Sequence, residues 1–95
     1  MPSTMTDRVQ LRRAALEWRL IDGEIVALDT RRSLFLAVNR TGATLWPALT
    51  HGATREELSR TLAEAFNLSP EHAARDVHSF LVTLEEEGLL ASEAD

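Results

Sequence analysis

The segment Leu28–Trp46, LDTRRSLFLAVNRTGATLW, decides the fold of this 95-residue chain. Its apolar run Leu34–Val38 predicts a β-strand, and the polar residues before that run form a turn. Upstream, Asp22-Gly23 is the two-residue signal of a type I′ hairpin, which predicts two further strands at about 16–20 and 25–28. Because a helical pattern follows directly after Val38, the chain is expected to be an α+β domain that begins with a three-stranded antiparallel sheet.

Three helices are expected after the strands. Thr41 is the expected N-cap of the first helix, which should end near His51. Thr54–Glu57 has the form of a capping box and predicts the start of the second helix. Ser69-Pro70 predicts the start of the third, which should run to about Glu87. Three strands followed by three helices are typical of a winged helix-turn-helix arrangement.

The composition indicates one small acidic domain. The net charge is -5, and the chain contains no cysteine, which excludes disulfide scaffolds and thiol catalysis. An acidic balance disfavours general nucleic-acid binding, and no segment has the apolar length of a membrane span, so the protein is expected to be cytoplasmic. We predict a flexible N-terminal arm at 1–13, a folded domain at 14–91 and a tail at 92–95.

No catalytic, metal or cofactor site is predicted. The three histidines are His51, His72 and His78, and the last two are six residues apart, which places them on different sides of one helix. The four glycines are isolated turn and cap residues, which argues against a phosphate-binding loop. The sequence therefore favours a binding role over catalysis.

The third strand carries the main binding signal. Leu34–Val38 is apolar on both faces, and an apolar edge strand invites pairing with another chain. The third predicted helix has an apolar stripe beside it, so the two form a groove suited to an added strand. Asp76 lies at the margin of that stripe, where it could contact a ligand or pair with Arg75 or Arg12.

A family resemblance follows from residues in a fixed order along the chain. These residues are Leu28-Asp29, Leu34–Ala43, Leu45-Trp46, His51-Gly52, Glu57-Leu58, Asp76-Val77, Phe80-Leu81, Leu84 and Gly88–Leu90. Over residues 16–90 the chain resembles the PqqD-like family, the leader-peptide recognition domains of ribosomally made and modified peptides. Within that family it is similar to the stand-alone B1 proteins of lasso-peptide pathways.

The resemblance implies a non-catalytic protein that binds the leader of a precursor peptide as an added β-strand. The implied peptide-binding residues are Leu34, Phe35, Leu36, Ala37, Val38, Asp76, Val77, Phe80, Leu81 and Leu84. It also implies delivery of the precursor to a B2-type leader peptidase and then to a macrolactam-forming ligase. Neither nucleic acid nor membrane is an expected partner, and the chain is expected to be a monomer or a weak homodimer.

Two alternatives remain at the level of sequence. The chain could serve as a PqqD-type peptide chaperone for a radical enzyme, because the same binding module occurs in other pathways. A winged-helix DNA-binding regulator is also compatible with the order of elements. The third helix argues against it, since Glu71, Asp76 and Glu85–Glu87 outweigh Arg75 on what would be the recognition helix.

Overall fold

The structure is a computed structural model, and it describes residues 8–91. The predicted tail, 92–95, and the first seven residues of the predicted arm lie outside these residues. The elements, in chain order, are β1 (Arg8–Val9), β2 (Leu16–Ile21), β3 (Glu24–Asp29), β4 (Leu34–Val38), α1 (Arg40–His51), β5 (Ala53–Thr54), α2 (Arg55–Phe66) and α3 (Pro70–Glu86).

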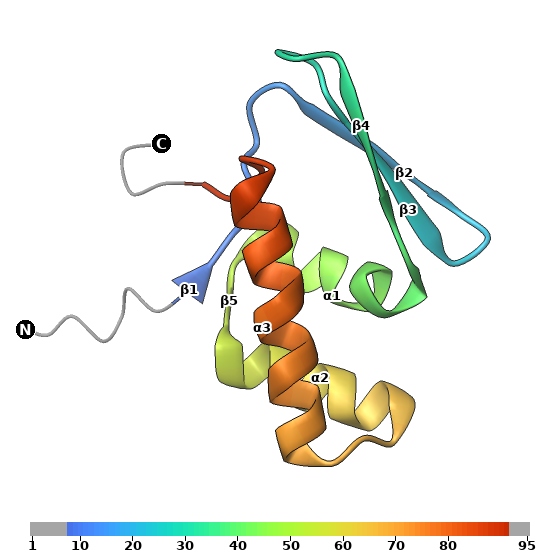
Figure 1. Ribbon diagram of the computed structural model, residues 1–95, viewed down its shortest axis with the longest axis vertical. Coiled ribbons are helices and arrows are strands. Elements are labelled where there is room, and N and C mark those ends of the chain that lie inside the picture. The colour runs from blue at the N-terminus through green and yellow to red at the C-terminus, as the bar shows by residue number, and fades with distance from the viewer. Residues whose placement is uncertain (1–7, 92–95) are drawn as a thin grey trace, which may run out of the picture.

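The predicted three-stranded sheet is confirmed. β3 pairs antiparallel with both β2 and β4, in the order β2-β3-β4. Asp22 and Gly23 both have positive φ, 53° and 81°, as a type I′ turn requires. Figure 1 shows this sheet on one side of the molecule and the three helices on the other. The α+β fold class is therefore confirmed.

The helix starts agree with the sequence except at α1. Asn39, rather than Thr41, is the N-cap of α1, and its side-chain oxygen accepts a hydrogen bond from the Gly42 N–H over 3.0 Å. Asn39 is the last residue with an extended backbone before the helix, so its side chain reaches the free N–H groups of the first turn. The predicted capping box of α2 is present between Thr54 and Glu57, and Ser69 caps α3.

Residues 8–13, which the sequence assigned to an arm, pack onto the domain as far as the structure describes that arm. β1 pairs with β5 as a second, two-stranded sheet. Leu11 is only 3% exposed and forms a β-bridge with Leu90, which joins the two ends of the domain. The short strands lacked a recognisable apolar run, so their pairing depends on contacts that are distant in sequence.

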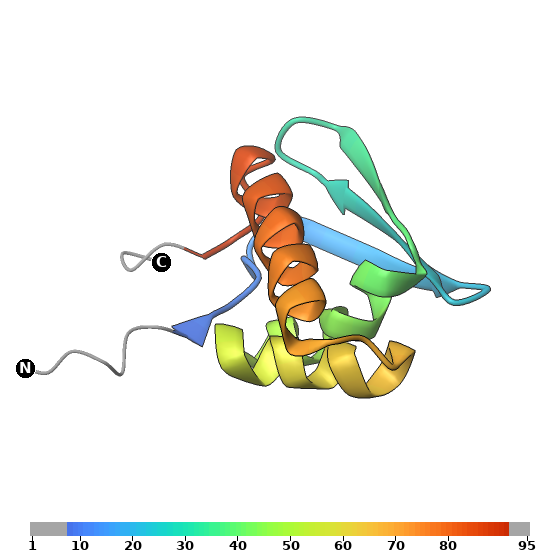
Figure 2. The same cartoon turned by 60° about the horizontal axis from the view of Figure 1, so that its bottom comes forward.

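One core joins the helices to the inner face of the sheet. Ile25 and Val38 from the sheet meet α1, α2 and α3 there, and Trp46 of α1 is completely buried. Trp18 of β2 packs edge to face against Trp46, with ring centroids 6.0 Å apart. Figure 2 shows α3 passing across the other two helices. No helix in the described part of the chain is both long and apolar enough to cross a bilayer.

Candidate peptide-binding groove

The edge of β4 is open. Among residues 8–91, β4 pairs only with β3, and the N-terminal strand that could have covered it pairs with β5 instead. A strand edge presents a row of N–H and C=O groups that seek partners. The position that an added strand would take is therefore not filled by the described part of the chain.

The predicted β4 residues differ in exposure. Phe35 is 73% exposed and Leu34 is 49% exposed, whereas Val38 is buried in the core. Leu36 is half-buried, and Ala37 is exposed. Since side chains alternate along a strand, Leu36 shares the inner face with Val38, while Phe35 and Ala37 lie on the outer face. A strand added to β4 would thus meet apolar side chains on both faces.

A hollow of about 310 Å³ lies beside the end of β4, between α1 and α3. Of the predicted helix residues, Asp76 and Phe80 line it. Its other lining residues are Asn39, Thr41, Gly42, Leu45, Ser79 and Thr83. The α3 residues among these are spaced as one helix face, so α3 offers a continuous surface to the hollow.

The other predicted helix residues lie in the core. Val77, Leu81 and Leu84 are at most 2% exposed. They anchor α3 to the rest of the domain and do not reach the hollow. The structure therefore separates the broad apolar stripe of α3 into a core face and a half-buried neighbouring face that contains Phe80.

Gly42 joins one end of the groove. A Cβ atom placed there would lie 2.6 Å from Cγ1 of Val38 and 2.7 Å from Cε1 of Phe80. Val38 is the last residue of β4, and Phe80 belongs to α3, so the two walls meet over this glycine. Only a residue without a side chain allows so close an approach.

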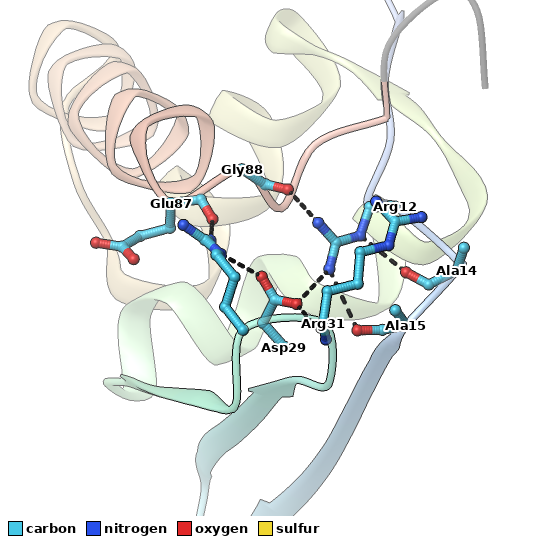
Figure 3. Close-up of polar contacts among 8 residues, drawn as sticks. Arg12, Ala14, Ala15, Asp29, Arg31, Glu87 and Gly88 are labelled. Atoms are coloured by element: carbon cyan, nitrogen blue, oxygen red, sulfur yellow. Dashed lines mark hydrogen bonds and ion pairs between the residues drawn. The ribbon is translucent and has the colours of Figure 1, made fainter.

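Asp29 is the last residue of β3 and lies near the end of the groove opposite Gly42 (Figure 3). Its carboxylate is buried and contacts Arg32 Nε over 2.9 Å and Arg12 Nη2 over 3.0 Å, and it also accepts from the backbone N–H of Arg31. The hydrogen bond from Arg32 is the largest cause that lowers the pKa of Asp29, from 3.8 to about 2. The carboxylate is therefore ionised across the physiological pH range.

Asp76 lines the hollow, and within residues 8–91 it forms no ion pair with an arginine. Its carboxylate lies 3.3 Å from Nε2 of His72, one turn earlier on α3, and both side chains are partly exposed. Of the two arginines considered as partners for Asp76, Arg75 forms no ion pair with it in the described residues, and Arg12 contacts Asp29 instead. Within the described residues, no group of three His, Cys, Asp or Glu side chains is placed to hold a metal ion.

The sequence did not identify most residues of the hollow. Ser79 and Thr83 follow Asp76 by three and seven residues, so helical spacing alone would have found them. Thr41 and Gly42 could not be found in this way, because their place depends on how α1 packs against α3. Asp29 and its arginines were also missed as a cluster.

The family follows from a comparison with known proteins. Residues 24–90 match the family described as coenzyme PQQ synthesis protein D (PqqD). The chain belongs to the PqqD family. The match spans β3, β4 and all three helices, and so includes the open strand and the α1 and α3 residues that line the hollow. No curated protein matches the chain.

Two solved structures share the fold of this PqqD-family chain. One is described as TbiB1 in complex with the TbiA(beta) leader peptide: it is 24% identical, with a TM-score of 0.79, over 90% of this chain and 99% of that one. The other is described as lasso peptide synthetase B1 complexed with the leader peptide. It is 23% identical, with a TM-score of 0.76, over 88% of this chain and 98% of that one.

Proposed function

We propose that this PqqD-family protein binds the leader of a ribosomally made precursor peptide as a fourth strand on β4. The observation that carries the proposal is the open, uncharged edge of β4 beside the hollow lined by Asp76 and Phe80. Main-chain hydrogen bonds would supply affinity, and the side chains of β4 and α3 would supply selectivity. Both solved proteins of the same fold are described as complexes with a leader peptide, which supports a leader as the occupant.

The proposed role is delivery rather than catalysis. A bound leader tethers the flexible core peptide and raises its effective concentration at an enzyme that also binds this domain. We propose lasso-peptide maturation as the pathway, with a B2-type leader peptidase and a macrolactam-forming ligase as the enzymes. One of the two solved proteins is described as a lasso peptide synthetase B1, which favours this pathway.

A PqqD-type chaperone for a radical enzyme is the second candidate. The family match itself favours it, because the matched description names coenzyme PQQ synthesis. The genes beside the coding sequence discriminate the two. A peptidase and an asparagine-synthetase-like ligase would indicate a lasso pathway, whereas a radical enzyme would indicate the alternative.

Titration of a leader with altered backbone tests the binding mode. The probe is the fluorescein-labelled leader of the short precursor encoded beside the gene, with its scrambled sequence as control. An added strand turns every second N–H toward its neighbour, so N-methylation should abolish binding at alternate positions of the bound segment and leave it nearly unchanged at the positions between. Equal sensitivity at adjacent positions, or equal binding of the scrambled peptide, would contradict the proposal.

A further inference from the structure

The two arginines that contact Asp29 also cap the C-terminal end of α3. Arg32 Nη2 donates to the carbonyl oxygen of Glu87, and Arg12 Nη1 donates to that of Gly88 over 2.7 Å. The last carbonyl groups of a helix lack partners within the helix and carry partial negative charge. The last turn of α3 has no basic residue of its own, so both guanidinium groups come from distant parts of the chain.

We propose that Asp29, Arg12 and Arg32, here called the Asp29 clamp, fix the separation of β4 from α3 and so hold the groove at the width that a bound strand needs. This inference rests on the proposed function. It assigns a positioning role to residues that lie outside the hollow. Asp29 orients both arginines, and the arginines hold the end of α3.

The place of the clamp in the fold supports this role. Arg32 lies in the turn immediately before β4, and Glu87 directly follows α3, so their contact joins the start of one wall to the end of the other. Gly42 joins the walls at the opposite end. Between these two joints, no hydrogen bond or ion pair links β4 to α3 within residues 8–91. Without the clamp, only apolar packing, which includes the close contact at Gly42, would hold β4 beside α3 in the described residues.

Arg31 provides a matched control for Arg32. It is the preceding residue in the same turn, and a change to glutamine removes the same charge. Its backbone N–H donates to Asp29, but its side chain makes no hydrogen bond or ion pair in the part of the chain that the structure describes. A difference between the two substitutions would therefore report the clamp rather than the net charge.

The first test compares leader affinity among three variants at a temperature where all are folded. Arg32→Gln should weaken binding of the labelled leader at least about fivefold, because a groove of variable width must be ordered on binding. Arg31→Gln should stay within about twofold of the unmodified protein, since it leaves the clamp intact. Thr54→Ala, which removes the capping box of α2 away from the groove, controls for a loss of stability without loss of the clamp.

The second test measures the separation between the turn before β4 and the last turn of α3. Since the chain has no cysteine, Thr30→Cys and Glu86→Cys give two unique sites for spin labels, one in the turn before β4 and one in the last turn of α3. Both positions are exposed. Double electron–electron resonance should show a broader distribution of label-to-label distances in the labelled Arg32→Gln protein than in the labelled Arg31→Gln protein or in the labelled protein without either substitution. The labelled leader should narrow the distribution of the parent.

The outcomes separate this inference from the proposed function. If the unmodified protein binds leader and scrambled peptide equally, the proposed function fails. If it binds the leader but Arg32→Gln binds as tightly, with an unchanged distance distribution, the clamp has no positioning role. A loss of affinity in Thr54→Ala as large as that in Arg32→Gln would also overturn the inference, because stability alone would then explain both.

Discussion

The two edges of the three-stranded sheet differ in what they offer to another chain. β2 carries Glu17 and Arg19, and its Trp18 packs against Trp46. β4 is entirely apolar and lies beside the hollow lined by α3. Charged side chains on an edge strand oppose pairing, whereas an uncharged edge permits it. One sheet thus combines an edge protected against association with an edge open to it, which would confine an added strand to β4.

The largest expected effect follows from a charge on the open edge. Phe35→Glu should weaken leader binding at least about tenfold, since it removes an apolar cross-strand pair and places a charge where the bound strand excludes water. The fold should persist, because Phe35 is 73% exposed. Fluorescence anisotropy with the labelled leader measures the affinity, and circular dichroism checks the fold.

Ile21→Glu is the matched control. Ile21 lies on β2, on the same outer face as Phe35, and is 48% exposed. The same charge on the protected edge should change affinity by less than about twofold, because a strand on β4 does not reach it. If Ile21→Glu weakened binding as much as Phe35→Glu, the leader would not be confined to the β4 edge.

The next largest effect is expected at Gly42, where Val38 of β4 and Phe80 of α3 come close together. Gly42→Ala should raise helix propensity by about 1 kcal/mol, but the added methyl group would lie within 2.7 Å of both Val38 and Phe80. Overpacking of this kind costs about 1 to 3 kcal/mol. We expect this cost to exceed the gain in helix propensity, because Val38 is buried and its side chain is stiff. We expect a lower free energy of unfolding in urea and a severalfold loss of leader affinity.

A double-mutant cycle tests whether the contact with Phe80 causes the loss of stability in Gly42→Ala. If the ring of Phe80 is what the methyl group displaces, Gly42→Ala should cost less in a Phe80→Ala background than in the parent protein. A gain of stability from Gly42→Ala alone would show that propensity outweighs the close contact and that α1 and α3 separate at little cost.

Much of the fold could be predicted from the sequence because its signals are local. Asp22-Gly23, the run Leu34–Val38 and the capping box of Thr54 each act within a few residues, and each is confirmed. β1 and β5 were missed, since two-residue strands have no pattern of their own. Asn39 was missed as the cap of α1 because Thr41 is equally suitable by residue type.

The groove could be predicted only in part because it is built from long-range contacts. Arg32, in the turn before β4, contacts Asp29 nearby but also reaches Glu87, 55 residues away. Arg12 reaches Gly88 across 76 residues. Leu81 and Phe80 are both apolar residues of one stripe, and only the packing of α3 shows that Leu81 is buried while Phe80 lines the hollow.

A smaller effect should follow when the protected edge loses its charges. The double variant Glu17→Val, Arg19→Val turns β2 into an uncharged strand, so self-association through this edge should appear at high protein concentration. Sedimentation velocity measures it. Leader peptide should not reverse this association, whereas it should reverse any weak dimer that the parent forms through β4. Reversal by leader in both proteins would mean that the two edges are not distinct.

The smallest effect concerns acid stability at the clamp. Because the folded-state pKa of Asp29 is about 2, below its ordinary 3.8, the unfolded chain binds the proton more readily. The ionised carboxylate therefore stabilises the fold fully above about pH 4, and this contribution is lost as the pH falls toward 2.

Asp29→Asn removes this contribution at every pH, so the difference in Tm between the parent and this variant should be greatest near pH 7 and should shrink toward pH 2. The lowered pKa of Glu57 acts in the same direction but is present in both proteins, so it cancels from the difference. A difference in Tm that stays constant from pH 7 to pH 2 would show that the charge of Asp29 is not what holds its two arginines.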